Sequence, residues 1–360
     1  MLKTQNSMKE LENRAAEALK ALFEQIPSIE LKDIELEPPG LDHGIDILVR
    51  LNAFNCQHVL VCEVKANGQP RHVRAALLQL CNYAAHLGRD ATPIFIAPYL
   101  SAESQAICQE HEVGFLDLQG NARVVFDGVF IERLVASRPP AERRELKSLF
   151  KPKAAQVLLV MLREPEHAWR VAELAEAAEL SLGHVSNVRN ALLDREWAQV
   201  TSDGLSLAEP DALLDAWKDD YEVPAGKRMR CYTSLHSNAF RVAAREALRG
   251  GPSKGQAVLA SFSAANWLAP YGRIGTHFFY ADDVGLERLQ DALKLSSASK
   301  GENVVVIIPK DRGLLHDTVE PAPGIVCTSP VRTYLDLMVA GERGREAADH
   351  LRRERLTWSK

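Results

Sequence analysis

Two short apolar segments with charged residues at their ends most constrain the fold of this chain. Residues 45–51 and 58–64 are apolar and rich in β-branched side chains, which predicts two β-strands. Asp46 lies near the start of the first segment, and Glu63 and Lys65 lie at the end of the second. Neighbouring strands can bring Asp46 and Glu63 side by side, and residues two apart on a strand share a face. Glu63 and Lys65 are therefore expected to point the same way.

These three side chains have the chemistry of a phosphodiester-cleaving site. Two carboxylates on one rim bind a hard divalent cation such as Mg²⁺ (or Mn²⁺) through oxygen. A lysine beside them can orient or deprotonate a water and stabilise charge on a phosphoryl oxygen. The alternative is a solvated Glu–Lys pair on a strand edge, since charged residues flank many strands.

The pattern Asp46…Glu63-x-Lys65 resembles the motif of the PD-(D/E)xK nuclease superfamily, which lies on a hairpin inside an αβββαβ core. Gln79 and Tyr83 fit the Q-x-x-x-Y pattern of its RecB-like branch. The resemblance implies that Asp46 and Glu63 hold the metal and that Lys65 serves the attacking water. It also implies that Gln79 and Tyr83 position the metal shell or the DNA strand.

The resemblance does not identify one possible metal ligand, and the sequence departs from the superfamily motif at one position. Ile45 stands where the superfamily name has proline, a common change. The superfamily often adds a glutamate from its first helix, and Glu12, Glu17 and Glu24 are all available. Nothing in the sequence selects among them.

The order of predicted elements supports the nuclease-like core. Helical residues come first, followed by the two strands, a helix, a strand, a helix and a short strand, at 7–25, 45–51, 58–64, 72–87, 92–97, 102–112 and 114–118. Gly120-Asn121 then predicts a tight turn between two strands. The alternative is that Asp117 and the amides of this turn lie near the cleft.

Composition bounds the rest of the chain. With 360 residues, two or three domains are expected. The six cysteines form no C-x-x-C pair, which argues against metal knuckles and disulfide scaffolds. No apolar run approaches the ~20 residues of a membrane span, and no secretory leader is present, so we expect a cytoplasmic protein without a membrane partner. The net charge of −5 argues against non-specific coating of nucleic acid.

A basic segment marks the first expected domain boundary. Residues 133–153 hold seven lysines and arginines against two glutamates, and Pro139, Pro140 and Pro152 interrupt regular structure there. We interpret the segment as a solvated linker or as a contact with the DNA backbone.

Residues 152–209 resemble a winged helix-turn-helix. Apolar residues predict helices at 154–163 and 171–179, and Ser181 is a good N-cap for a third. Residues 197–207 predict a β-hairpin wing. The inward face of the third helix is expected at Leu182, Val185, Val188 and Leu192. The opposite face is expected to be exposed, with Arg189 and Arg195 toward its flanks. The side chains expected to contact DNA are Ser181, His184, Ser186, Asn187, Arg189 and Asn190. The near-neutral charge leaves open a dimer contact, and His184 alone fits a surface histidine.

After residue 220 the pattern becomes α/β, and short motifs resemble AbiEi-type antitoxins. The motifs are Ser263-Ala264-Ala265 with Leu268-Ala269-Pro270, Cys327-Thr328-Ser329-Pro330 leading into Tyr334-Leu335-Asp336-Leu337, and Gly341-x-Arg343-Gly344-Arg345. The resemblance implies a regulator that binds its own promoter and opposes a partner toxin of the nucleotidyltransferase type. The nuclease-like N-terminal region departs from the short antitoxin architecture.

The sequence therefore predicts a multidomain α/β protein. The expected parts are a restriction-endonuclease-like αβββαβ domain (1–136), a basic linker (137–152), a winged helix-turn-helix (153–209) and an AbiEi-like α/β domain (210–360). The first hypothesis is a Mg²⁺-dependent DNA endonuclease directed by the winged helix, acting in phage defence or beside a toxin. The second is a non-cleaving AbiEi-type antitoxin or transcriptional regulator; a toxin-binding scaffold without DNA has little support. Because winged-helix regulators usually bind two half-sites, we expect a homodimer.

Overall fold

The computed structural model describes residues 2–38, 45–87, 91–135, 138–250, 255–273 and 275–358. The chain divides into two compact units. Unit 1 comprises Met1–Glu145 with Asn190–Glu196, and unit 2 comprises Leu146–Arg189 with Trp197–Lys360. The fold is mixed α/β, as predicted, with separate sheets, whereas the bounds of the four expected parts remain predictions. None of the described helices is long and apolar enough to cross a membrane.

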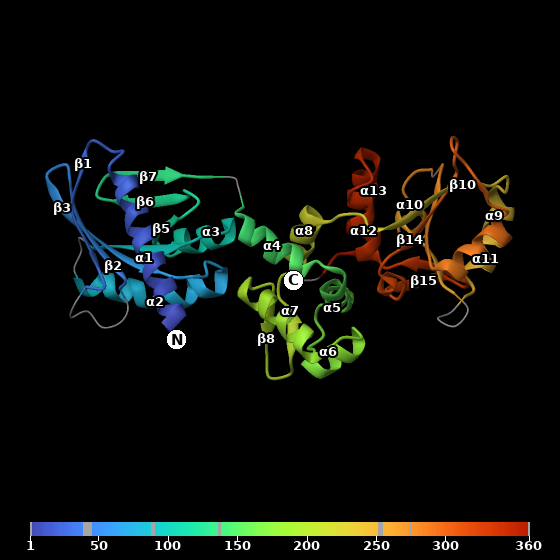
Figure 1. Ribbon diagram of the computed structural model, residues 1–360, viewed down its shortest axis with the longest axis horizontal. Helices are drawn as coiled ribbons and strands as arrows, with labels where there is room; N and C mark the ends of the chain where they lie inside the picture. The colour runs from blue at the N-terminus through green and yellow to red at the C-terminus, as the bar shows by residue number, and fades with distance from the viewer. Residues whose placement is uncertain are drawn as a thin grey trace. The chain divides into compact units, whose positions relative to one another are not determined.

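Unit 1 begins with an αβββαβ order of elements, the order that the family resemblance implies, although the sequence itself predicts only two of the first three strands. The elements are α1 (Leu2–Phe23), β1 (Ile29–Leu36), β2 (Ile47–Ala53), β3 (Cys56–Val64), α2 (Pro70–Leu87), β4 (Ala91–Ala97), α3 (Ala102–Glu110), β5 (Gly114–Asp117), β6 (Ala122–Phe126) and β7 (Val129–Arg133) (Figure 1). The strands form one sheet in chain order, β1 to β7. The β3–β4 and β4–β5 pairs are parallel, and the other pairs are antiparallel.

Two apolar clusters cover the two faces of this sheet. Residues Leu11, Ala15, Leu19 and Leu22 recur at helical spacing along α1 and pack with β-strand residues such as Cys62 on one face. Residues of α2 and α3 pack with Leu48 and Val61 on the other face. Since side chains alternate along a strand, Glu63, two residues after Val61, belongs to the α2 face. Asp46 lies just before β2, at the same end of the sheet.

The sequence did not predict β1 or the β6–β7 hairpin. Apolar residues alternate imperfectly in β1, because a bulge between Leu31 and Asp33 shifts its register against β2. The turn between β5 and β6 forms where Gly120-Asn121 predicts it, and Gly120 has a φ of +104°. A helix, α4 (Pro140–Leu149), lies within the segment that we interpret as a linker.

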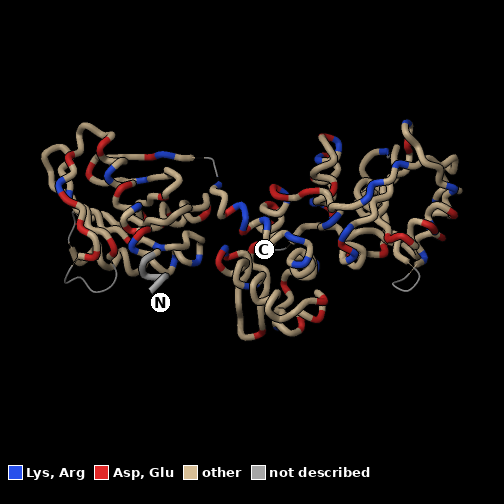
Figure 2. Tube along the Cα trace, viewed as in Figure 1, with Lys and Arg blue, Asp and Glu red and all other residues tan. Residues whose placement is uncertain are grey.

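The prolines of the basic segment begin helices instead of ending structure. Pro140 is the first residue of α4, and Pro152 is the first residue of α5 (Pro152–Arg163). Proline suits this position because its missing N–H would have no partner in the first turn. Leu146 and Leu149 are buried, while Arg143, Arg144 and Lys147 are exposed. Figure 2 shows the basic positions of α4 in blue along the trace. The segment is therefore an amphipathic helix.

Unit 2 contains three consecutive helices followed by a hairpin. These are α5, α6 (Val171–Ala177), α7 (Leu182–Asp194), whose last residues are counted with unit 1, β8 (Ala198–Val200) and β9 (Leu205–Leu207). The two strands pair antiparallel. This is the element order that the sequence predicts for residues 152–209.

The rest of unit 2 is built on a second seven-stranded sheet. The elements are α8 (Pro210–Asp220), β10 (Gly226–Tyr232), α9 (Ser237–Leu248), β11 (Ala257–Leu259), α10 (Ser261–Leu268), β12 (His277–Ala281), α11 (Asp283–Leu293), β13 (Ser296–Ser297), β14 (Val304–Pro309), the 3₁₀ helix η1 (Arg312–Leu315), β15 (Thr318–Ala322), β16 (Ile325–Thr328), α12 (Pro330–Met338) and α13 (Glu342–Arg355). The strand order is β13-β10-β14-β12-β11-β16-β15. The sequence did not predict α8.

Candidate functional site

Backbone pairing of β2 and β3 brings Asp46 next to Glu63. Ile47 is the register partner of Cys62, and the Asp46 N–H donates to the Cys62 carbonyl at 3.0 Å. The Asp46 side chain is fixed as well, because its Oδ2 accepts a hydrogen bond from the Val64 N–H at 2.6 Å. Both carboxylates therefore lie at the same end of the hairpin, as the sequence predicts.

Lys65 lies beside Glu63 on the same face. Its backbone N–H donates to the Ile96 carbonyl at 2.9 Å, which continues the β3–β4 pairing. Its Nζ lies 2.5 Å from Glu63 Oε1. Glu63 is only 2% exposed, and its second oxygen, Oε2, is buried without a hydrogen-bond partner. One carboxylate oxygen thus has the lysine as its partner, and the other has none.

Glu12 of α1 belongs to the same electrostatic cluster. It is 7% exposed, whereas Glu17 and Glu24 are exposed. Burial and the negative charge of Asp46 raise the pKa of Glu12. The structure therefore selects Glu12 among the three glutamates that the sequence leaves open. Glu12 lies on the side of α1 that carries the buried residues, and Glu17 lies on the opposite side, a signal that helical periodicity contains.

Burial governs the charge of the Asp46–Glu63 pair. Desolvation raises the pKa of Asp46, although its hydrogen bond from Val64 and the charge of Lys65 act in the opposite direction. Desolvation also raises the pKa of Glu63; Lys65 opposes this rise, and Asp46 adds to it. Since burial raises both values despite Lys65, the cluster holds more negative charge than its surroundings stabilise.

The carboxylate oxygens of Asp46 and Glu63 fit a hard divalent cation, although the protein does not supply a full set of ligands. Carboxylate oxygens are the ligands that Mg²⁺ and Mn²⁺ prefer, and the partnerless Glu63 Oε2 is such an oxygen. Among the described residues, no three His, Cys, Asp or Glu side chains converge closely enough to hold a metal ion. Mg²⁺ usually takes one or two carboxylates and keeps several waters, so two protein ligands suffice.

Gln79 and Tyr83 both lie on α2, on the face of the sheet that carries Glu63. Gln79 is exposed. Tyr83 is half-buried and packs against the core cluster between α2 and the sheet. Their roles in positioning a metal shell or a DNA strand remain predictions.

Asp117 has a structural role in the β5–β6 turn. It is buried, and its two oxygens accept hydrogen bonds from the N–H groups of Leu100, Gln119 and Asn121 and from the Asn121 side chain. The Asn121 side chain in turn accepts a hydrogen bond from the Val135 N–H at 2.6 Å. Because these bonds use both oxygens of Asp117, this residue stabilises the turn, in agreement with the first of the two interpretations of the sequence.

Helix α7 presents most of its predicted DNA-contacting residues at the surface. Ser181, His184, Asn187 and Asn190 are exposed, and Ser186 and Arg189 are half-buried. Val185, Val188 and Leu192 are buried, as predicted.

Two predictions about the faces of α7 are wrong. Leu182, expected in the core, is 56% exposed, because the first turn of the helix extends beyond the core. Arg195, expected toward the exposed face, is buried, with its Nη2 2.9 Å from Glu142 Oε1 and 3.6 Å from Glu145 Oε2. This arginine is therefore a structural residue.

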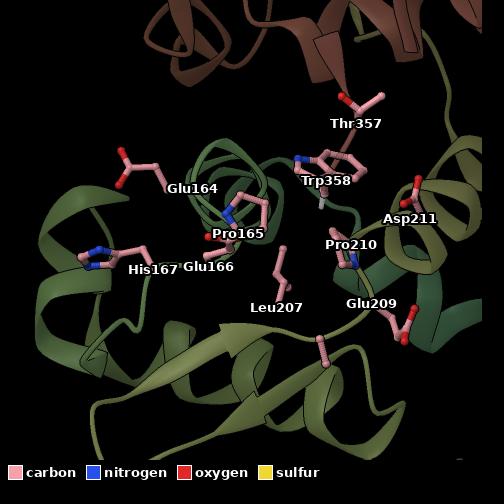
Figure 3. A pocket seen from close by; sticks show the side chains of 11 residues that line it. Glu164, Pro165, Glu166, His167, Leu207, Glu209, Pro210, Asp211, Thr357 and Trp358 are labelled. Atoms are coloured by element: carbon pink, nitrogen blue, oxygen red, sulfur yellow. The ribbon is translucent and has the colours of Figure 1, made fainter. Parts of the chain in front are cut away.

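A cavity of about 620 Å³ in unit 2 contains none of the predicted site residues (Figure 3). Its lining comes from the loop after α5, from β9 to the start of α8, and from the residues after α13. Among the described residues that line it are four carboxylates, Glu164, Glu166, Glu209 and Asp211, and neither lysine nor arginine. Its negative charge does not suit a nucleic-acid backbone.

Residues 206–357 match a family described as "Transcriptional regulator, AbiEi antitoxin, Type IV TA system". This region is similar to AbiEi antitoxins. The match contains all the antitoxin-like motifs that the sequence shows, from Ser263 to Arg345, and it confirms that resemblance. The match begins at residue 206, within β9, so α5, α6, α7 and β8 lie outside it.

Three solved structures match 29% of this chain. One is described as the crystal structure of a repair endonuclease from Pyrococcus abyssi, with 21% sequence identity and a TM-score of 0.22. The others are EndoMS in apo form (19% identity, TM-score 0.21) and an EndoMS–dsDNA2 complex (20% identity, TM-score 0.21). The match covers 46%, 45% and 44% of those chains, so this protein spans less than half of their length. No curated protein matches this chain in sequence.

Proposed function

We propose that unit 1 hydrolyses phosphodiester bonds of DNA in a divalent-metal-dependent reaction. The observation that carries the proposal is the buried Glu63 Oε2, which has no hydrogen-bond partner and lies beside Asp46 and Lys65. A buried carboxylate oxygen without a partner is costly, and such groups concentrate at functional sites.

Each side chain has a role that its surroundings favour. Asp46 and Glu63 would hold Mg²⁺ or Mn²⁺, and Glu12 would add negative charge from α1. The cation supplies Lewis-acid stabilisation of charge on the phosphoryl oxygens. Lys65 is partly exposed, so its ammonium can reach a phosphate while it stays close to Glu63. There it can orient the attacking water and stabilise the negative charge that develops.

The test of this proposal is cleavage of several DNA forms by the purified full chain. Supercoiled, linear, mismatched and single-stranded DNA are incubated with Mg²⁺, with Mn²⁺ and with EDTA. We expect cleavage only with a divalent cation, and we expect Glu63→Gln to abolish it. Glu17→Gln, an exposed glutamate of α1, is the matched control and should cleave normally. Absence of cleavage on every substrate, or equal activity of the two variants, contradicts the proposal.

We also propose that residues 152–209 act as a winged helix that binds DNA, with α7 in the major groove. The supporting observation is the cluster of short polar side chains, His184, Asn187 and Asn190, at the surface of α7. A dimer would place two such helices on two half-sites. Sedimentation of the full chain with and without DNA tests the dimer.

The second candidate function is a non-cleaving transcriptional regulator and antitoxin. The family match of residues 206–357 favours it specifically. Its expected properties are tight promoter binding that persists in EDTA and neutralisation of a co-expressed partner toxin of the nucleotidyltransferase type. The two functions are compatible, because a regulator can carry a cutting domain. Normal repression and neutralisation by Glu63→Gln would show that regulation does not need the carboxylate cluster.

A further inference from the structure

A second cavity of unit 2 differs in charge from the acidic one. It measures about 310 Å³, at the lower end of the range of small-molecule sites. Its walls come from the residues before and at the start of α5, from α8 and the segment after it, from η1 and from α12. Three of its lining side chains are cationic: Lys147, Lys151 and Arg332.

Arg332 is an unusual lining residue, because its guanidinium is buried and incompletely bonded. The residue is 5% exposed, and its Nε has no hydrogen-bond partner. Its Cζ lies 5.8 Å from the Trp217 ring centroid and 6.0 Å from that of Tyr221. Asp336 balances its charge; its Oδ1 accepts hydrogen bonds from the Tyr221 and Tyr280 hydroxyls, and its Oδ2, like Arg332 Nε, is buried without a hydrogen-bond partner. A residue that lines this cavity therefore carries a buried guanidinium N–H without a partner.

Asp220 adds an acceptor to the same cavity. Its Oδ2 is buried and has no hydrogen-bond partner. One lining residue thus offers an unused N–H donor and another offers an unused carboxylate acceptor. A ligand that satisfies both must itself carry an acceptor and a hydrogen-bond donor, either N–H or O–H.

The rim of the cavity is basic and partly aromatic. Lys147 and Lys151 are exposed, and the 3.6 Å ion pair of Lys147 with Glu222 is solvent-exposed and therefore weak. Phe150 stacks on Trp217 with ring centroids 5.7 Å apart and an interplanar angle of 4°. Two ammonium groups attract a phosphate, and a half-buried aromatic ring offers apolar surface beside it.

We propose that this cavity binds a small phosphorylated ligand with an N–H donor, the chemistry of a mononucleotide. The phosphate would lie at Lys147 and Lys151, and the polar edge of the base would reach Arg332 and Asp220. The proposal does not depend on the nuclease function, because every residue that carries it belongs to unit 2. The acidic cavity in Figure 3 is not expected to bind this ligand, because its carboxylates repel a phosphate.

The test is calorimetric titration of the full chain with ATP, GTP, CTP, UTP and AMP, with inorganic phosphate as the reference ligand. All titrations contain EDTA, so that no metal-bridged binding at Asp46 and Glu63 contributes. We expect saturable binding of at least one nucleotide. The double variant Lys147→Glu/Lys151→Glu should weaken that binding by at least about tenfold, a change of about 1.4 kcal/mol.

Two controls keep the result interpretable. Lys153→Glu changes an exposed lysine two residues away that does not line the cavity, and it should bind normally. Arg332→Gln should abolish binding, and the lysine variants keep the test valid if this buried substitution prevents folding. The proposal is wrong if no nucleotide binds saturably, if Lys153→Glu weakens binding as much as the double variant, or if phosphate binds as tightly as every nucleotide.

Discussion

The open end of the β2–β3 hairpin, where Asp46 and Glu63 lie, and the polar face of α7 both present polar residues. They differ in burial. Glu63 is buried and Asp46 is fixed by a backbone hydrogen bond, and burial raises the pKa of both carboxylates. Asn187 and Asn190 of α7 are exposed to solvent.

The difference lies in what each region costs the folded protein. Burying charged groups destabilises a fold unless a partner compensates, so the hairpin cluster needs a functional explanation. Exposed amides cost almost nothing, so α7 is compatible with DNA binding without requiring it. The variants below separate the two regions by the size of their effects.

The largest expected effect is on cleavage. Lys65→Ala removes the ammonium beside Glu63 and should lower the cleavage rate at saturating DNA by about 100- to 10,000-fold. Lys20→Ala, an exposed lysine of α1, is the matched control. Single-turnover assays in Mn²⁺ measure both rates. Undiminished cleavage by Lys65→Ala would remove the lysine from the site.

A leucine pair tests the two faces of α7. Leu192 is 0% exposed, so Leu192→Ala should lower the free energy of unfolding by about 2–5 kcal/mol. Leu182 is exposed, so Leu182→Ala should change the same quantity by less than about 0.5 kcal/mol. Urea denaturation measures both. Similar losses in the two variants would place Leu182 in the core after all.

The next effect concerns DNA affinity. Asn187→Ala and Asn190→Ala should each weaken specific binding by about 1–3 kcal/mol, because a side chain that contacts base edges is lost. Asn238→Ala, an exposed asparagine of α9, should bind normally. Electrophoretic mobility shifts at fixed salt provide the measurement. Unchanged affinity in both α7 variants would favour the dimer-contact interpretation.

The smallest expected effect is on stability and its pH dependence. The pKa of Asp46 is raised in the folded state, so the folded protein holds this proton more tightly than the unfolded chain. The contribution of Asp46 to the free energy of unfolding therefore decreases as pH rises from about 3.9, the pKa of an unfolded aspartate, through its raised pKa in the folded protein. Asp46→Asn removes this loss and should raise Tm at neutral pH in EDTA by about 2–4 °C, the shift that corresponds to about 1 kcal/mol. A lower Tm for the variant would show that the carboxylate stabilises the fold.

The sequence predicted the parts of the site that depend on local pattern. Apolar runs located β2 and β3, and alternation along β3 placed Glu63 and Lys65 on one face, where they form an ion pair. Alternation could not reveal β1, because a bulge between Leu31 and Asp33 interrupts it. Helical periodicity places Glu12 on the buried side of α1, but its interaction with Asp46 was visible only in the structure.

Tertiary contacts account for the predictions that were wrong. The periodicity of α7 places Leu182 with the core residues, but helix position alone does not say where the core ends. Arg195 has a surface pattern in sequence, yet Glu142, 53 positions earlier, supplies the carboxylate that allows its burial. Buried polar contacts between segments distant in sequence leave no local signature.

Direct binding of Mn²⁺ is the measurement that most closely tests the central interpretation of unit 1. Electron paramagnetic resonance of the full chain titrated with Mn²⁺ should show saturable binding. That binding should be lost in Asp46→Asn and Glu63→Gln and retained in Glu17→Gln. If the wild-type chain shows no saturable site, or if all three variants bind Mn²⁺ equally well, the paired carboxylates do not form a metal-binding site.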